Sequence, residues 1–205
     1  YWWYWHGNGG YSGVALALSK AAVPVQPRFF HPEFDHENRI VCAELDDVIF
    51  ASIYVPNGGK DFPAKMRFLE AMERFVSGAH ALGKKLVLCG DLNVALTPRD
   101  VHPELANPTQ IGQTGPERAL MEQIIGHGLV DLLRHFAPDD DRLFTWWAPW
   151  RNFREKNVGW RLDFVLATHG LLPKARSCRG FREFGSSDHG PVMAVFDGPL
   201  FDAGK

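Results

Sequence analysis

The stretch KKLVLCGDLNVA, residues 84–95, decides the fold class. Its apolar centre, residues 86–89, predicts a short buried strand, and Gly90 lets the backbone turn at the end of that strand. Asp91 and Asn93 are two residues apart, so in an extended chain their side chains point the same way. A carboxylate and an amide therefore emerge together at a carboxyl strand end, which is where α/β proteins place their ligands. A capping Asp in a tight turn is the competing interpretation.

Strand-like and helix-like segments alternate around this stretch. The helix predicted over 64–82 has apolar residues at steps of three and four and ends at Gly83, and a second helix is predicted over 116–126. Aromatic residues 1–5 and a Gly-rich turn at 6–10 predict a hairpin with the strand that follows. The predicted strands cover 11–18, 38–45, 48–55, 86–89, 162–167 and 191–196. Short strands mixed with helices predict an α/β fold, with sheets packed under helices in one domain over 1–205.

The composition excludes several classes of protein. The chain has 205 residues, of which 45% are hydrophobic and 22% charged, which fits one globular domain rather than a disordered, collagen-like or coiled-coil protein. No apolar run approaches the roughly 20 residues of a membrane-spanning helix. Cys42, Cys89 and Cys178 are odd in number and far apart, which favours neither a disulfide framework nor a zinc site. We expect a reducing, cytoplasmic setting, nucleoid-associated in a bacterium, and no membrane partner.

The charge is unevenly distributed along the chain. Residues 142–182 carry nine Lys and Arg against two acidic residues, a net charge of +7, although the whole chain has a net charge of −2. Such a segment suggests a face that binds anions. A solvated basic edge is an equally good interpretation of the charge alone.

Two further acidic positions are associated with strands. Asp163 lies within the apolar sequence GWRLDFVLA, where a carboxylate is costly unless a charged or hydrogen-bonding group meets it. Asp188 and His189 sit in a polar turn just before the last strand, and Asp163 and His189 make the natural pair. An isolated Asp-His dipeptide is more often an ordinary surface feature.

The sequence YVPNGGK forms a fourth element at a strand end. Asn57 and Lys60 project from its Gly-rich turn, as residues that contact phosphate do. Tyr54 precedes the turn, and a core aromatic is the commoner role for a tyrosine in such a position.

These elements together are similar to a known family. GYSGVAL, NRIV, YVPNGGK, LVLCGDLNVA, KNVGWRLDFVLA and SSDHGPV occur in the order and spacing of the exonuclease III type of abasic-site endonuclease, within the endonuclease/exonuclease/phosphatase superfamily. The resemblance extends over about 11–196, and YVPNGG with NVGWRLDF narrows it to the abasic-site branch. It implies a DNase I-like fold: a two-sheet β-sandwich flanked by helices, in four α/β/β/α layers.

The resemblance also implies roles for individual residues. Asp91 would be the general base or acid, Asn93 would hold the attacking water, and Tyr54 would contact the phosphate. His189, oriented by Asp163, would hydrogen-bond the scissile phosphate. The implied metal ligands are Asp91, Asn93, Asp188 and His189. Oxygen and amide ligands without thiolates favour Mg²⁺, with Mn²⁺ as the alternative.

DNA contacts follow from the same resemblance. Trp146, Trp160 and Leu162 would line the pocket that receives an extruded abasic sugar, and its size would reject an intact nucleotide. Trp147 and Trp150 fit either this surface or the core. The positions that match contacts to the DNA backbone or nearby loops are Arg39, Asn57, Lys60 and Asn107. The implied partner is double-stranded DNA with abasic sites or 3′ ends.

The sequence departs from the family at its start. The family's first strand, first helix and main metal-binding glutamate are absent, and Glu33, Glu37 and Glu44 lie in the wrong context to replace that glutamate. We therefore expect an N-terminally incomplete copy that is weak or inactive alone. The leading hypothesis is an exonuclease III-type hydrolase of base-excision repair, incising 5′ to abasic sites with 3′–5′ exonuclease or 3′-phosphodiesterase activity. The alternatives are a catalytically impaired DNA-binding fragment and a lipid or inositol phosphatase of the same superfamily.

Overall fold

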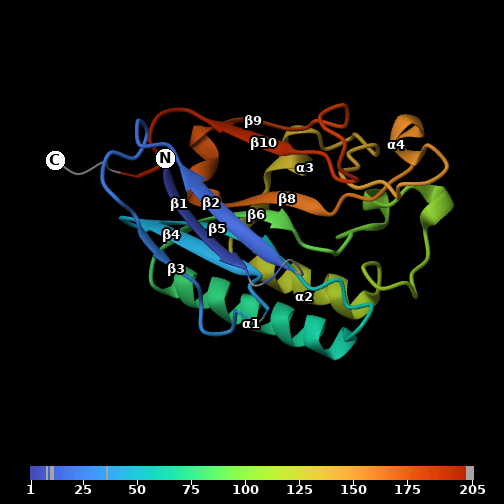
Figure 1. The fold of residues 1–205 in the computed structure, drawn as a ribbon, viewed down its shortest axis with the longest axis horizontal. Coiled ribbons are helices and arrows are strands. Elements are labelled where there is room, and N and C mark those ends of the chain that lie inside the picture. The colour runs from blue at the N-terminus through green and yellow to red at the C-terminus, as the bar shows by residue number, and fades with distance from the viewer. Residues whose placement is uncertain (8, 10–11, 36, 202–205) are drawn as a thin grey trace.

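A six-stranded mixed sheet forms the centre of the computed structural model, which describes residues 1–7, 9, 12–35 and 37–201 (Figure 1). Strands β5 and β6 pair in parallel, and the other neighbouring strands are antiparallel. A parallel pair requires a crossover connection, which helix α1 (Phe62–Ala81) provides. The α/β class predicted from the sequence is confirmed. In spatial order the strands are β3 (Arg28–Phe30), β4 (Ile40–Leu45), β5 (Val48–Tyr54), β6 (Lys85–Asp91), β8 (Asp163–Thr168) and β7 (Leu129–Asp131).

Helices α1 and α2 (Gly115–Gly126) cover one face of this sheet, the lower one in Figure 1. The buried side of α1 follows the spacing expected from the sequence and includes Phe68, Leu69, Met72 and Val76. Asp61 caps the start of α1, where its carboxylate accepts a hydrogen bond from the Ala64 N–H at 2.8 Å. Both predicted helices are therefore confirmed, with ends shifted by at most two residues. Within the described residues, no helix is both long and apolar enough to span a membrane.

Two antiparallel hairpins lie against the opposite face of the sheet. Strands β1 (Trp2–Gly7) and β2 (Gly13–Leu18) form the predicted N-terminal hairpin. The turn predicted over 6–10 falls partly on residues 8 and 10, which lie outside the described residues. Strands β9 (Ala175–Gly180) and β10 (Val192–Phe196) form the second hairpin. The second hairpin helps to enclose a separate apolar cluster that includes Val87, Val165 and Cys178. The outer side of β1 is exposed, at 65% for Trp3 and 71% for Trp5.

Several short elements were not predicted from the sequence. They are β3, β7, β9, α3 (Leu132–Phe136), α4 (Phe153–Lys156) and the 3₁₀ turns η1 (Pro98–Asp100), η2 (Pro103–Leu105) and η3 (His169–Lys174). Elements of three to six residues contain too little periodicity to be recognised, and pairing with distant strands creates them.

The alternation of side chains along β6 determines which face carries the polar strand end. Leu86 and Leu88 point into the helix-covered core, whereas Val87 belongs to the opposite cluster. Asp91 has the parity of Val87, so its side chain lies on the face away from the helices. Gly90, the residue directly before Asp91, pairs with Ile53 of β5.

Replacement of Gly90 by alanine should strongly destabilise the sheet. The backbone of Gly90 has φ +138°, and a Cβ at this position would lie 1.9 Å from the Ile53 carbonyl oxygen. We expect Gly90→Ala to lower the free energy of unfolding by about 3 kcal/mol or more, measured by urea denaturation. Gly78→Ala is the matched control, because Gly78 is exposed in α1 with open space around it. The control should stabilise by roughly 0.5–1 kcal/mol, and equal effects of the two changes would contradict this account.

Candidate active site

A row of three polar side chains crosses neighbouring strands at one end of the sheet. Tyr54 at the end of β5 pairs with Asp91 at the end of β6, and Asp91 pairs with Asp163 at the start of β8. Residues that pair directly across strands have side chains on the same face. The three strands therefore bring a phenol and two carboxylates together, as the sequence predicted for a ligand site at this strand end.

Asn93 is fixed against Asp91. The backbone of Asn93 is left-handed, with φ 50°, and its N–H donates to Asp91 Oδ1 at 2.9 Å. Its side-chain Nδ2 donates both to Asp91 Oδ2 and to the Val55 carbonyl, each at 2.9 Å. Asn57 Nδ2 donates to Asn93 Oδ1 at 3.3 Å, so the YVPNGGK turn contacts the same group. The two residues that the sequence singled out thus form one hydrogen-bonded unit.

His189 forms the predicted pair with Asp163. Its Nδ1 lies 2.8 Å from Asp163 Oδ2, and the two side chains are 30% and 19% exposed. An isolated β-bridge connects His189 to Trp146, and a second connects Trp146 to Trp160. His189 is therefore the hydrogen-bonding partner that the half-buried Asp163 carboxylate was expected to need.

The protonation of these groups is shifted by their surroundings. Burial raises the pKa of Asp91 to about 7, and the charge of Asp163 adds to the rise. Burial alone would lower the pKa of His189, but its hydrogen bond to Asp163 and the charges of Asp163, Asp91 and Asp188 raise it overall. A carboxyl group that titrates near neutrality, close to an imidazole whose charged form is favoured, is suited to moving protons.

Asp188 lies at the exposed edge of the site. Trp146 Nε1 donates to Asp188 Oδ2 at 3.0 Å, and Ser187 Oγ lies 3.4 Å from Asp188 Oδ1. Among the residues that the structure describes, no three His, Cys, Asp or Glu side chains converge in a way that could hold a metal ion. The oxygen and amide groups suit Mg²⁺ in kind, but they do not form a complete cage.

The four polar residues that were predicted to contact DNA lie in different environments. Arg39 is 4% exposed, with its guanidinium 4.7 Å from the centre of the Tyr54 ring and 2.8 Å from Glu37 Oε2, so it supports the tyrosine from below. Asn57 and Lys60 are exposed on the turn after β5. Asn107 is exposed, and its Oδ1 accepts hydrogen bonds from the N–H and hydroxyl of Thr109.

A cavity of about 340 Å³ lies beside the site and is lined by aromatic side chains. Trp146 and Trp160 meet edge to face in its wall, with ring centres 5.8 Å apart. Trp150, 58% exposed, also lines it, whereas Trp147 is 1% exposed and belongs to the core. The question that the sequence left open is therefore answered differently for the two tryptophans. Leu162 is buried beneath the cavity, in a cluster with Trp160.

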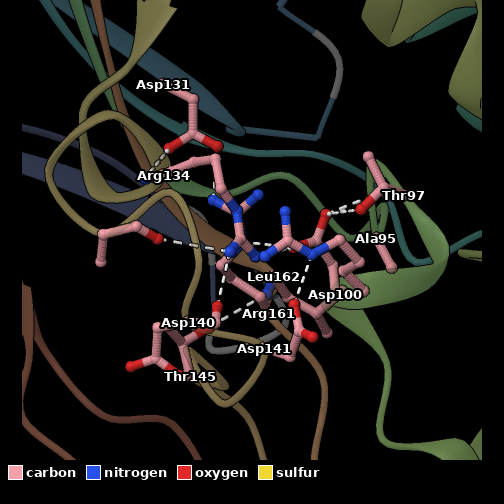
Figure 2. A network of polar contacts seen from close by, with 12 residues as sticks. Ala95, Thr97, Asp100, Asp131, Arg134, Asp140, Asp141, Thr145, Arg161 and Leu162 are labelled. Atoms are coloured by element: carbon pink, nitrogen blue, oxygen red, sulfur yellow. Dashed lines mark hydrogen bonds and ion pairs between the residues drawn. The ribbon is translucent and has the colours of Figure 1, made fainter.

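Sequence reasoning missed the groups that hold the start of β8. The buried Thr145 hydroxyl accepts the N–H groups of Leu162 and Asp163, each at 3.0 Å. Figure 2 shows Arg161 within a network of acids, where its Nε donates to the fully buried Asp100 at 2.7 Å and its Nη1 to Asp131 at 2.5 Å. An arginine directly before the apolar strand was the available signal, but its partners are 30 and 61 residues away.

Two further residues beneath the site were also missed. Lys65 of α1 and Glu117 of α2 are fully buried and form an ion pair of 2.5 Å. Lys65 stands on the apolar face of α1, three residues before Phe68, and a charged residue at such a position was a readable signal.

Comparisons with known proteins agree with this geometry. The sequence profile described as the Endonuclease/Exonuclease/phosphatase family matches residues 1–189. The chain is 34% identical over 192 residues to "Recombination repair protein 1" of Drosophila melanogaster and 33% identical over 196 residues to "DNA repair nuclease APEX1" of Danio rerio. Both alignments cover 92% of this chain, which spans only 28% and 63% of the lengths of these two relatives.

A solved structure shares the fold. The AP endonuclease from Archaeoglobus fulgidus superimposes with a TM-score of 0.83 at 27% sequence identity. The match covers 95% of this chain and 79% of that protein. The six-stranded mixed sheet thus belongs to the architecture of an AP endonuclease.

Removal of the Thr145 hydroxyl should destabilise the start of β8. Thr145→Val keeps the shape but leaves two buried N–H groups without an acceptor, so we expect a loss of about 2–4 kcal/mol in unfolding free energy. Thr145→Ser retains the oxygen and should cost about 1 kcal/mol. Urea unfolding followed by tryptophan fluorescence measures both. A loss in Thr145→Val no larger than that in Thr145→Ser would contradict the role assigned to the hydroxyl.

Proposed function

Because the chain belongs to the Endonuclease/Exonuclease/phosphatase family, we propose that it is a divalent-metal-dependent nuclease acting on DNA. Its proposed reaction is incision 5′ to abasic sites, with additional hydrolysis at 3′ ends, in base-excision repair. The observation that carries this proposal is the row formed by Tyr54, Asp91 and Asp163, with Asn93 and His189 attached to its two acids. The row provides a proton acceptor and hydrogen-bond donors on one face, as phosphodiester hydrolysis requires.

Asp91 is the proposed general base. Its pKa of about 7 lets the carboxylate accept a proton near neutral pH, while Asn93 holds both carboxylate oxygens in place. In the proposed step a water oxygen bonds to phosphorus and its proton passes to Asp91. The bond from phosphorus to the 3′ oxygen on the 5′ side of the abasic sugar then breaks, and this oxygen takes a proton from solvent to become a hydroxyl. Asp91 afterwards releases its own proton to solvent. The products are a free 3′ end and a 5′-phosphate on the abasic residue.

His189 and Tyr54 are the proposed phosphate contacts. Asp163 binds Nδ1 of His189, which directs Nε2 of the imidazolium toward the substrate. Its raised pKa favours the charged form of the ring, at a position where negative charge develops on the phosphate. The Tyr54 hydroxyl is the proposed second hydrogen-bond donor to the phosphate, and Arg39 beneath the ring fixes its orientation.

Mg²⁺ is the proposed cofactor, with Mn²⁺ as the alternative. Asp91 and Asp188 are the carboxylates available to it, and water and substrate phosphate would complete the shell, as is usual for Mg²⁺. The bound ion would supply positive charge that offsets the charge of the phosphate.

The surface around the row suits damaged DNA. The cavity is lined by the rings of Trp146 and Trp160, whose apolar surfaces would pack against a sugar without its base. Asn57, Lys60 and Asn107 lie on exposed turns, where they would contact the DNA backbone. The +7 charge of residues 142–182 fits the same polyanion.

The finer architecture is part of the proposal. We infer that the two hairpins take the place of the second sheet in a four-layer DNase I-like sandwich, and that residues 1–205 act as one domain. Support comes from the apolar cluster that β9 and β10 share with the sheet, on the side opposite α1 and α2.

Incision of a duplex with a single tetrahydrofuran abasic analogue tests the function. With Mg²⁺ we expect a nick 5′ to the analogue, and EDTA should abolish it. Asp91→Asn should reduce kcat by about 10²–10⁴-fold because the proton acceptor is lost. The matched control is Asp46→Asn, at the turn before β5 and so at the opposite end of the sheet, which should leave kcat unchanged.

Other outcomes point to the competing functions. Duplex binding without any nick would indicate a DNA-binding protein without catalysis. Release of phosphate from an inositol polyphosphate, with no action on DNA, would indicate a phosphatase. Equal nicking by wild type and Asp91→Asn would refute the assignment of Asp91.

A further inference from the structure

Lys65 is a buried lysine, and each of the three N–H donors of its ammonium group has a partner. The side chain is fully buried, and its Nζ donates to the Asn93 carbonyl at 2.7 Å and to the Asn57 carbonyl at 3.2 Å. The third contact is Glu117 Oε1 at 2.5 Å. An ammonium group has three donors, so these contacts account for all of them. Lys65 therefore connects the two turns that follow β5 and β6 at the candidate active site.

Glu117 is held as firmly as its partner. Its carboxylate accepts the Gly112 N–H at 2.8 Å, the Thr114 N–H at 3.1 Å and the Thr114 hydroxyl at 2.6 Å. The contact from the Thr114 N–H is half of the capping box at the start of α2. The ion pair therefore has a fixed place, defined by one helix that carries Lys65 and another that carries Glu117.

The turn around Asn57 is shaped to fit Lys65. Gly58 has φ +88°, and a Cβ there would lie 2.8 Å from Lys65 Cδ. The turn passes this closely over the lysine stem because residue 58 has no side chain. On the other side, Asn93 presents its carbonyl to Lys65 and its side chain to Asp91 and Asn57. One ammonium group thus sets the separation of the two turns.

Stability alone gives no reason for this arrangement. A buried ion pair is often no more stabilising than apolar side chains of similar volume, because both charges must be removed from water. The pair lies where it can fix two backbone carbonyls, each belonging to a residue that reaches the candidate site.

We propose that Lys65 is a positioning residue of the active site, which fixes Asn57 and Asn93 from beneath and so holds Asp91 in its working orientation. The effect on catalysis rests on the proposed nuclease function. The anchoring of the two turns does not, and it is measured separately below.

The test compares Lys65→Met with the double variant Lys65→Met/Glu117→Gln. The single change leaves the Glu117 carboxylate buried without its cation and should lower the melting temperature. The double change removes both charges, keeps an acceptor in the capping box and should recover most of that loss. We expect kcat for incision to stay about 10–100-fold below wild type in both variants, with KM changed less than about threefold.

Glu117→Gln provides a second variant that keeps the anchor. Lys65 can still donate to both carbonyls, so kcat should remain within about threefold of wild type even if the protein melts earlier. Lys84→Met is the matched control elsewhere, because Lys84 pairs with Glu44 near the start of β6, away from the site. It should leave kcat unchanged.

Hydrogen exchange of residues 55–61 and 91–96 measures the anchor without any substrate. Exchange should be at least about tenfold faster in the double variant than in wild type and unchanged in Lys84→Met. Recovery of kcat together with melting temperature in the double variant would overturn the proposal, as would unchanged exchange in both segments. If wild type cleaves no DNA, the nuclease proposal fails, and the exchange rates still decide whether Lys65 anchors the two turns.

Discussion

The pairing of Asp91 with Asp163 across two central strands is the constraint on which the rest of the site depends. Like charges directly opposite each other weaken a sheet, and here they also lie partly out of water. The fold compensates on both sides: His189 faces Asp163, and two N–H donors of Asn93 face Asp91. Burial, with a smaller contribution from the charge of Asp163, still raises the pKa of Asp91 to about 7. This raised pKa suits the proposed role, because a carboxylate whose charged form is stabilised completely would be a poor proton acceptor at neutral pH.

Buried polar contacts beneath the row keep these groups in place. Thr145 holds the backbone of Asp163, and its own carbonyl accepts the Gly190 N–H next to His189. Arg161 ties the same strand start to Asp100, while Lys65 holds the turn of Asn93. Thr145 and Lys65 act on backbone groups and Arg161 acts on the Asp100 carboxylate, so none of these supports contacts the reactive atoms. A site held in this way is pre-organised, since its side chains need not reorder when a substrate arrives.

The sequence revealed the parts of this structure that depend on local pattern. Strand β6, both long helices and the Asp163–His189 pair follow from apolar periodicity, from a glycine at a strand end and from one unpaired acid within an apolar run. The supports could not be predicted, because Lys65 meets its partners 28 and 52 residues away and nothing local identifies them. Arg39 shows the same limit. The family resemblance implied a contact near the DNA, whereas the burial of Arg39 under Tyr54 depends on the pairing of β4 with β5. Trp147 is buried and Trp150 is exposed, although they lie three residues apart, and no local pattern distinguishes them.

Trp146 contacts both the aromatic cavity and the polar groups of the site. One residue therefore connects the shape of the cavity to the position of the acids. Its ring forms part of the cavity wall, its Nε1 donates to Asp188, and its backbone bridges to both Trp160 and His189. Gly112 packs so closely under Trp160 that a Cβ would lie 2.9 Å from the ring, which leaves the wall little room to move. Under the proposed function, a rigid wall that shares its backbone contacts with the imidazole would transmit the fit of a bound sugar to the position of the phosphate beside it. A group too large for the cavity would then displace its phosphate from the row, which would select the substrate without reading a base.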